Sequence, residues 1–189
     1  DIKASWIRKN IGMVLQEPFL FSRTIAENIS ITQREMPMEE IRQAAKIACV
    51  DDAITEFANG YDTMVGERGV TLSGGQKQRT AIARMLTQKT PIMVFDDSLS
   101  AVDAETDAKI RQALRKNLGD STVILISHRI TTLMQAECIL VLDKGRVAEM
   151  GSHEELMRNH GIYRHIYDMQ MTMPEASPEA LSEEVNLNE

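Results

Sequence analysis

The sequence lacks the features of several protein classes. Its two cysteines, Cys49 and Cys138, are far apart and form no Cys-X-X-Cys pair. A disulfide between them is possible but unsupported, and this spacing favours two buried free thiols in a reducing compartment. No apolar run approaches the roughly 18 residues that a membrane helix needs. The polar start Asp1-Ile2-Lys3 does not resemble a secretory signal. We therefore expect an ordinary globular chain.

Excess charge of one sign is also missing from most of the chain. The formal net charge is −7, but six acidic residues and no Lys or Arg lie from Asp168 onward. The preceding residues hold 21 basic and 22 acidic side chains, so we expect no nucleic-acid partner. Two prolines, five glutamates and the lack of aromatic residues predict an acidic disordered tail over 169–189.

Hydrophobic periodicity predicts an α/β fold. Apolar runs predict buried strands at 11–15, 91–95 and 122–126, and a hairpin at the sheet edge from runs at 137–142 and 146–150. Helices are expected at 24–29, 38–49, 51–58, 73–88 and 103–118, from about 130, and around 154 and 163. Their alternation in the second half predicts a parallel sheet with crossover helices, covered on both faces. A mostly helical subdomain at about 17–88 precedes an α/β core at about 89–168.

Residues 72–76 read Leu-Ser-Gly-Gly-Gln and precede a run with helical periodicity. Ser73 is a favourable helix cap, and Gly74 and Gly75 leave the first backbone N–H groups uncovered. Two interpretations follow: an ordinary glycine-rich cap, or a phosphate-binding helix end that also includes Gln76.

Polar side chains follow two of the predicted strands. Asp96 and Asp97 come after the second strand, where α/β folds bind ligands. They could bind Mg²⁺ and orient a water, or they could form a turn that caps a helix. His128 follows the next strand and either donates a hydrogen bond to a phosphate or has a structural role. Asp103 lies six residues after Asp97.

Five motifs in this order resemble the nucleotide-binding domain of an ABC transporter, over about residues 1–168. They are Gln16 after a strand, LSGGQ, MVFDD, SLSAVD and ISHR. The segments 21–29 and 63–69 are similar to those of ABC exporters in particular. The resemblance implies a P-loop NTPase-like parallel-sheet core with an inserted helical signature subdomain.

The resemblance also implies a role for each matching residue. Gln16 would approach Mg²⁺ and the attacking water. Residues 73–76 (Ser73, Gly74, Gly75 and Gln76) would contact the terminal phosphate of ATP bound to the opposite subunit. Asp96 would bind Mg²⁺, Asp97 would occupy the position of the general base, Asp103 would cross the dimer interface, and His128 would be the switch histidine.

One departure from the family is the missing P-loop. The pattern G-X-X-X-X-G-K-[S/T] does not occur, since Gly69 and Gly74 are followed by Gly75-Gln76. We expect the P-loop, the adenine-stacking aromatic residue and the membrane helices to lie before Asp1. By itself the fragment would then be inactive as an ATPase.

A second departure is Asp97, because the family usually has Glu as the base at this position. Asp is one methylene shorter, so its carboxylate falls back by about 1.5 Å, and a 1 Å misplacement can cost about 10²-fold in rate. The favoured interpretation is a heterodimeric exporter in which this subunit has a degenerate ATP site and an intact signature completing the partner's site. The alternatives are a homodimeric exporter with a slow Asp base and a regulator without transport activity.

The partners implied are a second half-transporter and the coupling helices of membrane domains, at the cytoplasmic face of the cell membrane. The transported substrate is not encoded in the motifs.

Overall fold

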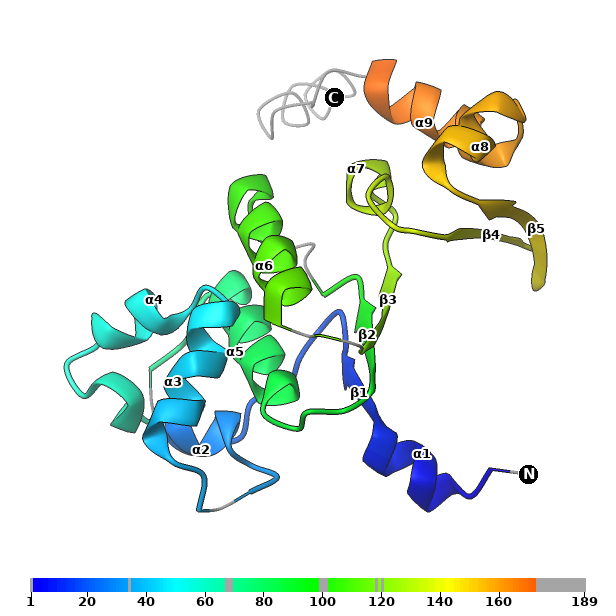
Figure 1. The fold of residues 1–189 in the computed structure, drawn as a ribbon. Coiled ribbons are helices and arrows are strands. Elements are labelled where there is room, and N and C mark those ends of the chain that lie inside the picture. The colour runs from blue at the N-terminus through cyan, green and yellow to red at the C-terminus, as the bar shows by residue number, and fades with distance from the viewer. Residues whose placement is uncertain are drawn as a thin grey trace, which may run out of the picture. The chain divides into compact units, whose positions relative to one another are not determined.

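A computed structural model describes residues 2–33, 35–66, 70–98, 102–117, 119 and 121–172 (Figure 1). The chain separates into two compact units, residues 1–126 and 127–189. Each unit is described by itself.

The first unit contains a parallel sheet of three strands, β1 (Ile11–Val14), β2 (Ile92–Asp96) and β3 (Thr122–Ile126), in that order. In the register of the sheet, Val14 lies opposite Phe95, and Phe95 lies opposite Leu125. The carboxyl ends of all three strands therefore meet at one edge of the sheet. This confirms the predicted parallel sheet, and β3 has the predicted bounds.

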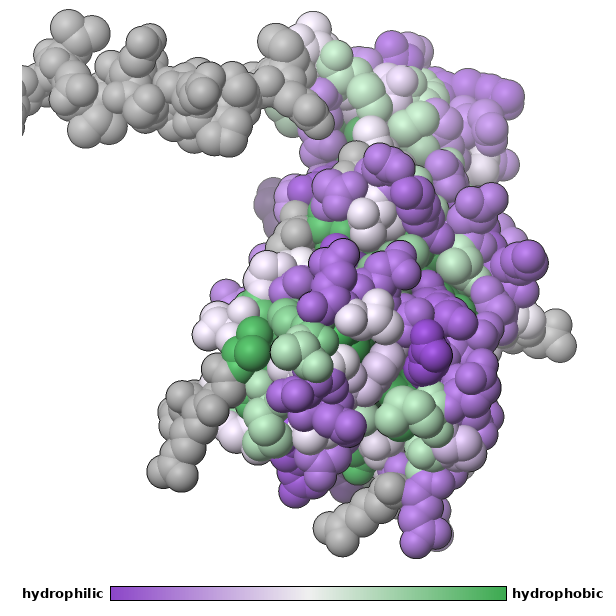
Figure 2. Space-filling model, turned by 90° about the vertical axis from the view of Figure 1, so that its left-hand side faces the viewer, coloured by the Kyte–Doolittle hydropathy of each residue, from purple (hydrophilic) through white to green (hydrophobic). Residues whose placement is uncertain are grey.

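Helices of the first unit gather on one side of this sheet (Figure 1). They are α2 (Ile25–Ile29), α3 (Met38–Ile47), α4 (Asp51–Thr55), α5 (Gly74–Leu86) and α6 (Ala104–Asn117), with a 3-10 turn at Gly60–Asp62. Their apolar faces and the sheet share one core, in which Ile82, Phe95 and Ile110 are fully buried. On the helical side, Figure 2 shows smaller hydrophobic areas among hydrophilic residues, as amphipathic helices require.

The helix α1 (Ala4–Asn10) precedes β1 and was not expected from the sequence. It has no side-chain cap and none of its residues is buried. Its sequence therefore carries neither a capping signal nor an apolar stripe that faces a core.

We expected both faces of the sheet to be covered, but the face opposite these helices is partly exposed. Met13, Ile124 and Ile126 point to this face and are 46–56% exposed. Alternation along a strand explains the pattern, since Val14 and Leu125 face the helices. The helices of the first unit cover only one side of the sheet, although all three strands are apolar on both sides.

A buried polar cluster ties α5 to the segment after β1. Arg84 on α5 donates to the carbonyl oxygens of Phe19 and Asn28 at 2.8 and 2.7 Å, and to Asn28 Oδ1 at 2.9 Å. Asn28, fully buried on α2, also accepts from the N–H of Phe21 and donates to its carbonyl oxygen. Burial lowers the pKa of Arg84. The guanidinium thus supplies a donor to the backbone carbonyl of the fully buried Asn28.

The second unit contains α7 (Ile130–Leu133), β4 (Ile139–Asp143), β5 (Arg146–Gly151), α8 (His153–Arg158) and α9 (Ile162–Thr172). Ile130, Ile139, Leu156 and Tyr163 form its buried core. The predicted hairpin is confirmed as the antiparallel pair β4 and β5. Its predicted place at the sheet edge is wrong for the described residues, because the hairpin forms a separate two-stranded sheet.

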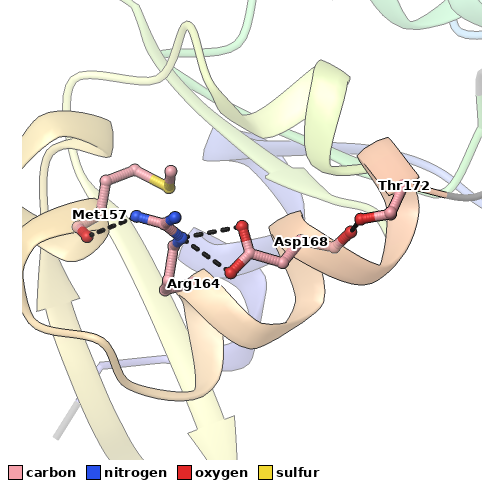
Figure 3. A network of polar contacts seen from close by, with 4 residues as sticks. All are labelled: Met157, Arg164, Asp168 and Thr172. Atoms are coloured by element: carbon pink, nitrogen blue, oxygen red, sulfur yellow. Dashed lines mark hydrogen bonds and ion pairs between the residues drawn. The ribbon is translucent and has the colours of Figure 1, made fainter.

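Polar contacts fix the helices of this unit. The Glu149 carboxylate accepts the N–H groups of Ile162 and Tyr163 at the start of α9. Along α9, Arg164 binds both carboxylate oxygens of Asp168 at 2.8 Å and the Met157 carbonyl oxygen at 3.4 Å (Figure 3). The helix α9 extends to Thr172, four residues into the segment predicted as tail. The rest of that tail, 173–189, lies outside the described residues.

We predict that Arg84→Met lowers the free energy of unfolding by about 1–3 kcal/mol, because it removes the side-chain donor to the Asn28 carbonyl oxygen and one of the two donors to Asn28 Oδ1. Chemical or thermal unfolding of the protein measures the change. Lys89→Met is the matched control, because the exposed Lys89–Glu40 pair contributes at most about 1 kcal/mol. Equal losses in the two variants would contradict the role given to Arg84.

Candidate functional site

The N-terminus of α5 is closed by a reciprocal pair of hydrogen bonds. Ser73 Oγ accepts the N–H of Gln76 at 3.2 Å, and Gln76 Oε1 accepts the N–H of Ser73 at 2.9 Å. Together they form a capping box. The predicted cap at Ser73 is therefore confirmed, and the Gln76 side chain provides the second hydrogen bond of the capping box.

This capping box leaves a set of hydrogen-bond donors at the helix end. Because Ser73 Oγ and Gln76 Oε1 are occupied as acceptors, the Ser73 O–H and the Gln76 NH₂ group remain as donors. The N–H groups of Gly74 and Gly75 have no acceptor within a helix at these first two positions. We call these four groups the donor face. With the positive end of the helix dipole behind it, the donor face suits an anion rich in acceptors, such as a phosphate.

Three candidate residues follow strands at the carboxyl edge of the sheet. Gln16 is the second residue after β1, Asp96 ends β2, and Asp97 comes next. Since Val14 lies opposite Phe95 in the parallel register, the two strands end at the same level. The sheet thus brings Gln16, Asp96 and Asp97 to one edge, as the sequence predicted. Gln16 is exposed, and the two aspartates are partly exposed.

A residue that sequence reasoning missed links this edge to the signature helix. The buried Gln78 on α5 donates from Nε2 to the carbonyl oxygen of Gln16 at 3.1 Å. Gln78 lies only two residues after Gln76, so one helix carries the donor face and also holds the backbone at Gln16. The sequence does contain a signal for Gln78, because a polar glutamine stands on the apolar face of the predicted helix at 73–88.

The backbone turns sharply at Asp97. Its φ is +43°, and its N–H donates to the carbonyl oxygen of Ile126 at 2.8 Å, which extends the pairing of β2 with β3. Asp and Asn adopt this left-handed region more readily than most other residues. Strain of this kind is common at functional sites.

Asp103 caps α6. Its Oδ1 accepts the N–H of Thr106 at 2.9 Å, and this bond lowers the pKa of the exposed carboxyl group. Residues 99–101 of the same motif and residues 67–69 of the predicted exporter segment lie outside the described residues. A place for Asp103 in a dimer interface stays a prediction.

His128 belongs to the second unit, two residues after β3 ends. It is exposed and lies just before α7. Its predicted position beside the aspartates spans both units and stays a prediction.

No group of three or more His, Cys, Asp or Glu residues within the described ranges could hold a metal ion. The two cysteines are free, but Cys49 is partly exposed and Cys138 is exposed, so the predicted burial of both thiols is wrong.

An apolar hollow of about 220 Å³ lies beside the segment that follows β1. Leu15, Phe19, Phe21 and Met85 contribute to its lining. Phe19 and Leu15 are 69% and 53% exposed, and the rings of Phe19 and Phe21 meet edge to face.

Comparison with known proteins identifies the family. The model of the ABC transporter family matches residues 1–100. The chain is 48% identical to the uncharacterized ABC transporter ATP-binding protein YknU of Bacillus subtilis (strain 168), over 90% of the chain and 29% of that protein. It is 45% identical to the leukotoxin translocation ATP-binding protein LktB of Mannheimia haemolytica, over 88% of the chain and 24% of that protein.

A bacterial Atm1-family ABC exporter, solved with ATP bound, has a similar structure. The TM-score is 0.86 at 41% identity, over 93% of this chain and 30% of that chain. The chain thus spans less than a third of the length of these relatives. Among its described residues, no helix has the length and apolar character to cross a membrane. The family model, the motifs and the matching α/β fold agree, and the chain belongs to the ABC transporter family.

Proposed function

We propose that this chain is part of the ATP-hydrolysing machinery of an ABC exporter, in which two nucleotide-binding domains close on ATP. The donor face at the start of α5 carries the proposal. Its four donors suit the terminal phosphate of ATP held by the opposite subunit, as the family resemblance implies.

The residues at the sheet edge suit Mg²⁺ and ATP. Mg²⁺ commonly binds through one or two carboxylates together with the phosphates of a substrate. Asp96 offers a carboxylate at the end of β2, Gln16 offers an amide oxygen, and the described residues hold no larger ligand group. Bound Mg²⁺ supplies positive charge that stabilises the transferring phosphoryl group. Asp97 would orient the attacking water, and His128 would donate a hydrogen bond to the terminal phosphate.

The apolar hollow beside Gln16 suits the coupling helix of a membrane domain. Exposed Leu15 and Phe19 offer apolar surface, and the segment that bears them is tied to α5 by Arg84. A helix docked there would contact the same rigid group as the donor face. A domain docked in this way would lie at the cytoplasmic face of the membrane.

Asp97 supports a heterodimer with one degenerate site. Its shorter carboxylate would be a poor base, whereas the capping box at Ser73 and Gln76 is complete. This subunit would therefore contribute the donor face to the partner's site and hydrolyse little ATP at its own Asp97.

We predict that Gln76→Glu lowers the ATPase rate of the assembled exporter by about 10²-fold, the loss typical of removing one donor from a charge-stabilising site. Glu still accepts the N–H of Ser73 and so preserves the capping box, but it brings a negative charge to the phosphate. Steady-state ATPase assays measure the rate, and thermal unfolding should show no loss of stability.

Gln43→Glu is the matched control, because it makes the same change at an exposed residue of another helix, α3. Activity of Gln76→Glu within twofold of this control would contradict the role of the donor face.

We predict that Asp97→Ala leaves more than half of the ATPase activity of the exporter, and that Asp97→Glu raises turnover at this subunit's site. Replacing the partner's general base should remove most activity, because that site performs most hydrolysis. ATPase assays on the reconstituted pair measure all three. If Asp97→Ala removes as much activity as the partner's change, Asp97 is a working base and the site is not degenerate.

A further inference from the structure

A side chain from α9 binds the backbone on both sides of Arg129, next to His128. Gln170 lies on α9, and its Oε1 accepts the N–H of Ile130 at 2.8 Å. Its Nε2 donates to the carbonyl oxygen of His128 at 2.7 Å. All these residues belong to the second unit. One amide group thus bridges two backbone groups that lie about 40 residues earlier in the chain.

These bonds meet a need of the local backbone. The first N–H groups of a helix lack intrahelical acceptors, and Arg129, the residue at the cap position of α7, makes no side-chain capping bond. Gln170 supplies an acceptor for the first of these N–H groups. Ser127 Oγ accepts the N–H of Arg129 at 3.1 Å. Side chains, rather than a strand or helix ladder, therefore hold consecutive backbone groups around His128.

The pair of bonds requires a carboxamide. A carboxamide offers an acceptor and a donor on the same carbon, about 2 Å apart, whereas an ionised carboxylate accepts only. At position 170, Glu would keep the bond to Ile130 and lose the bond to His128. Ala would lose both.

We propose that Gln170 is a positioning residue for His128. It fixes the backbone from which the imidazole projects, so the C-terminal helix α9 supports the hydrolytic site without touching ATP. The proposal rests on the proposed function, in which His128 contacts the terminal phosphate. Because a misplacement of 1 Å can cost about 10²-fold, a loosened His128 backbone should slow hydrolysis and leave ATP binding largely unchanged.

The test compares Gln170→Ala, Gln170→Glu, His128→Ala and the control Met169→Ala in the whole protein with its partner. Each is added to a pair in which Asp97→Glu restores a base at this subunit's site and the partner's general base is replaced, so that turnover reports this site. Met169 is an exposed neighbour on α9. Met169→Ala therefore controls for the effect of side-chain truncation on the helix itself. Gln170→Ala should lower kcat by roughly tenfold or more with KM for ATP within about twofold, which marks loss of an interaction that acts on the chemical step. Gln170→Glu should fall between Gln170→Ala and wild type. Met169→Ala should match wild type.

Hydrogen exchange gives a readout that is independent of activity. The Ile130 amide should exchange faster in Gln170→Ala than in wild type and should be unchanged in Met169→Ala. If Gln170→Ala does not fold, Gln170→Glu is used for the test, because it keeps the bond to Ile130 and loses only the bond to His128.

The outcomes distinguish failure of the proposed function from failure of the positioning role of Gln170. Full activity of His128→Ala would overturn the role given to His128 in the proposed function. Loss of activity in His128→Ala, with Gln170→Ala within twofold of Met169→Ala, would overturn the positioning role alone. A fall in thermal stability with kcat and KM changing together would also overturn it, because that pattern marks a merely structural residue.

Discussion

The hydrogen bonds of Arg84 are the constraint on which the first unit depends. A half-buried cation is stable where acceptors surround it, and here the acceptors are the Phe19 and Asn28 carbonyl oxygens and the Asn28 side chain. Thr87, just beyond the end of α5, donates from Oγ1 to the Ile29 carbonyl oxygen, and Gln78 near its start donates to that of Gln16. The helix is thus anchored along its length to the segment that follows β1. A displacement of that segment must move the donor face at the start of α5 as well.

Local signals explain what the sequence could predict. Ser73 was identified as a cap from its residue type, and it forms a capping box with Gln76, as Thr24 does with Glu27 at the start of α2. Asp96 and Asp97 were placed at the sheet edge because apolar strands end there. These features depend on neighbours within a few residues.

Features that depend on distant partners were not predictable. Arg84 lies 56 residues from Asn28, and Gln170 lies 40 residues from Ile130, so no local pattern indicates either contact. The separate sheet of β4 and β5 was mispredicted for a similar reason. Alternating apolar residues specify a hairpin, but they do not specify which other strand it joins.

The most direct measurement of the central claim is hydrogen exchange at Gly74 and Gly75 in the assembled exporter. These amides have no acceptor within α5, so a bound phosphate should protect them. Addition of Mg²⁺ and ATP to a hydrolysis-deficient pair is expected to slow their exchange, and ADP is expected to leave it unchanged. Unchanged exchange with bound ATP would contradict phosphate binding at the donor face.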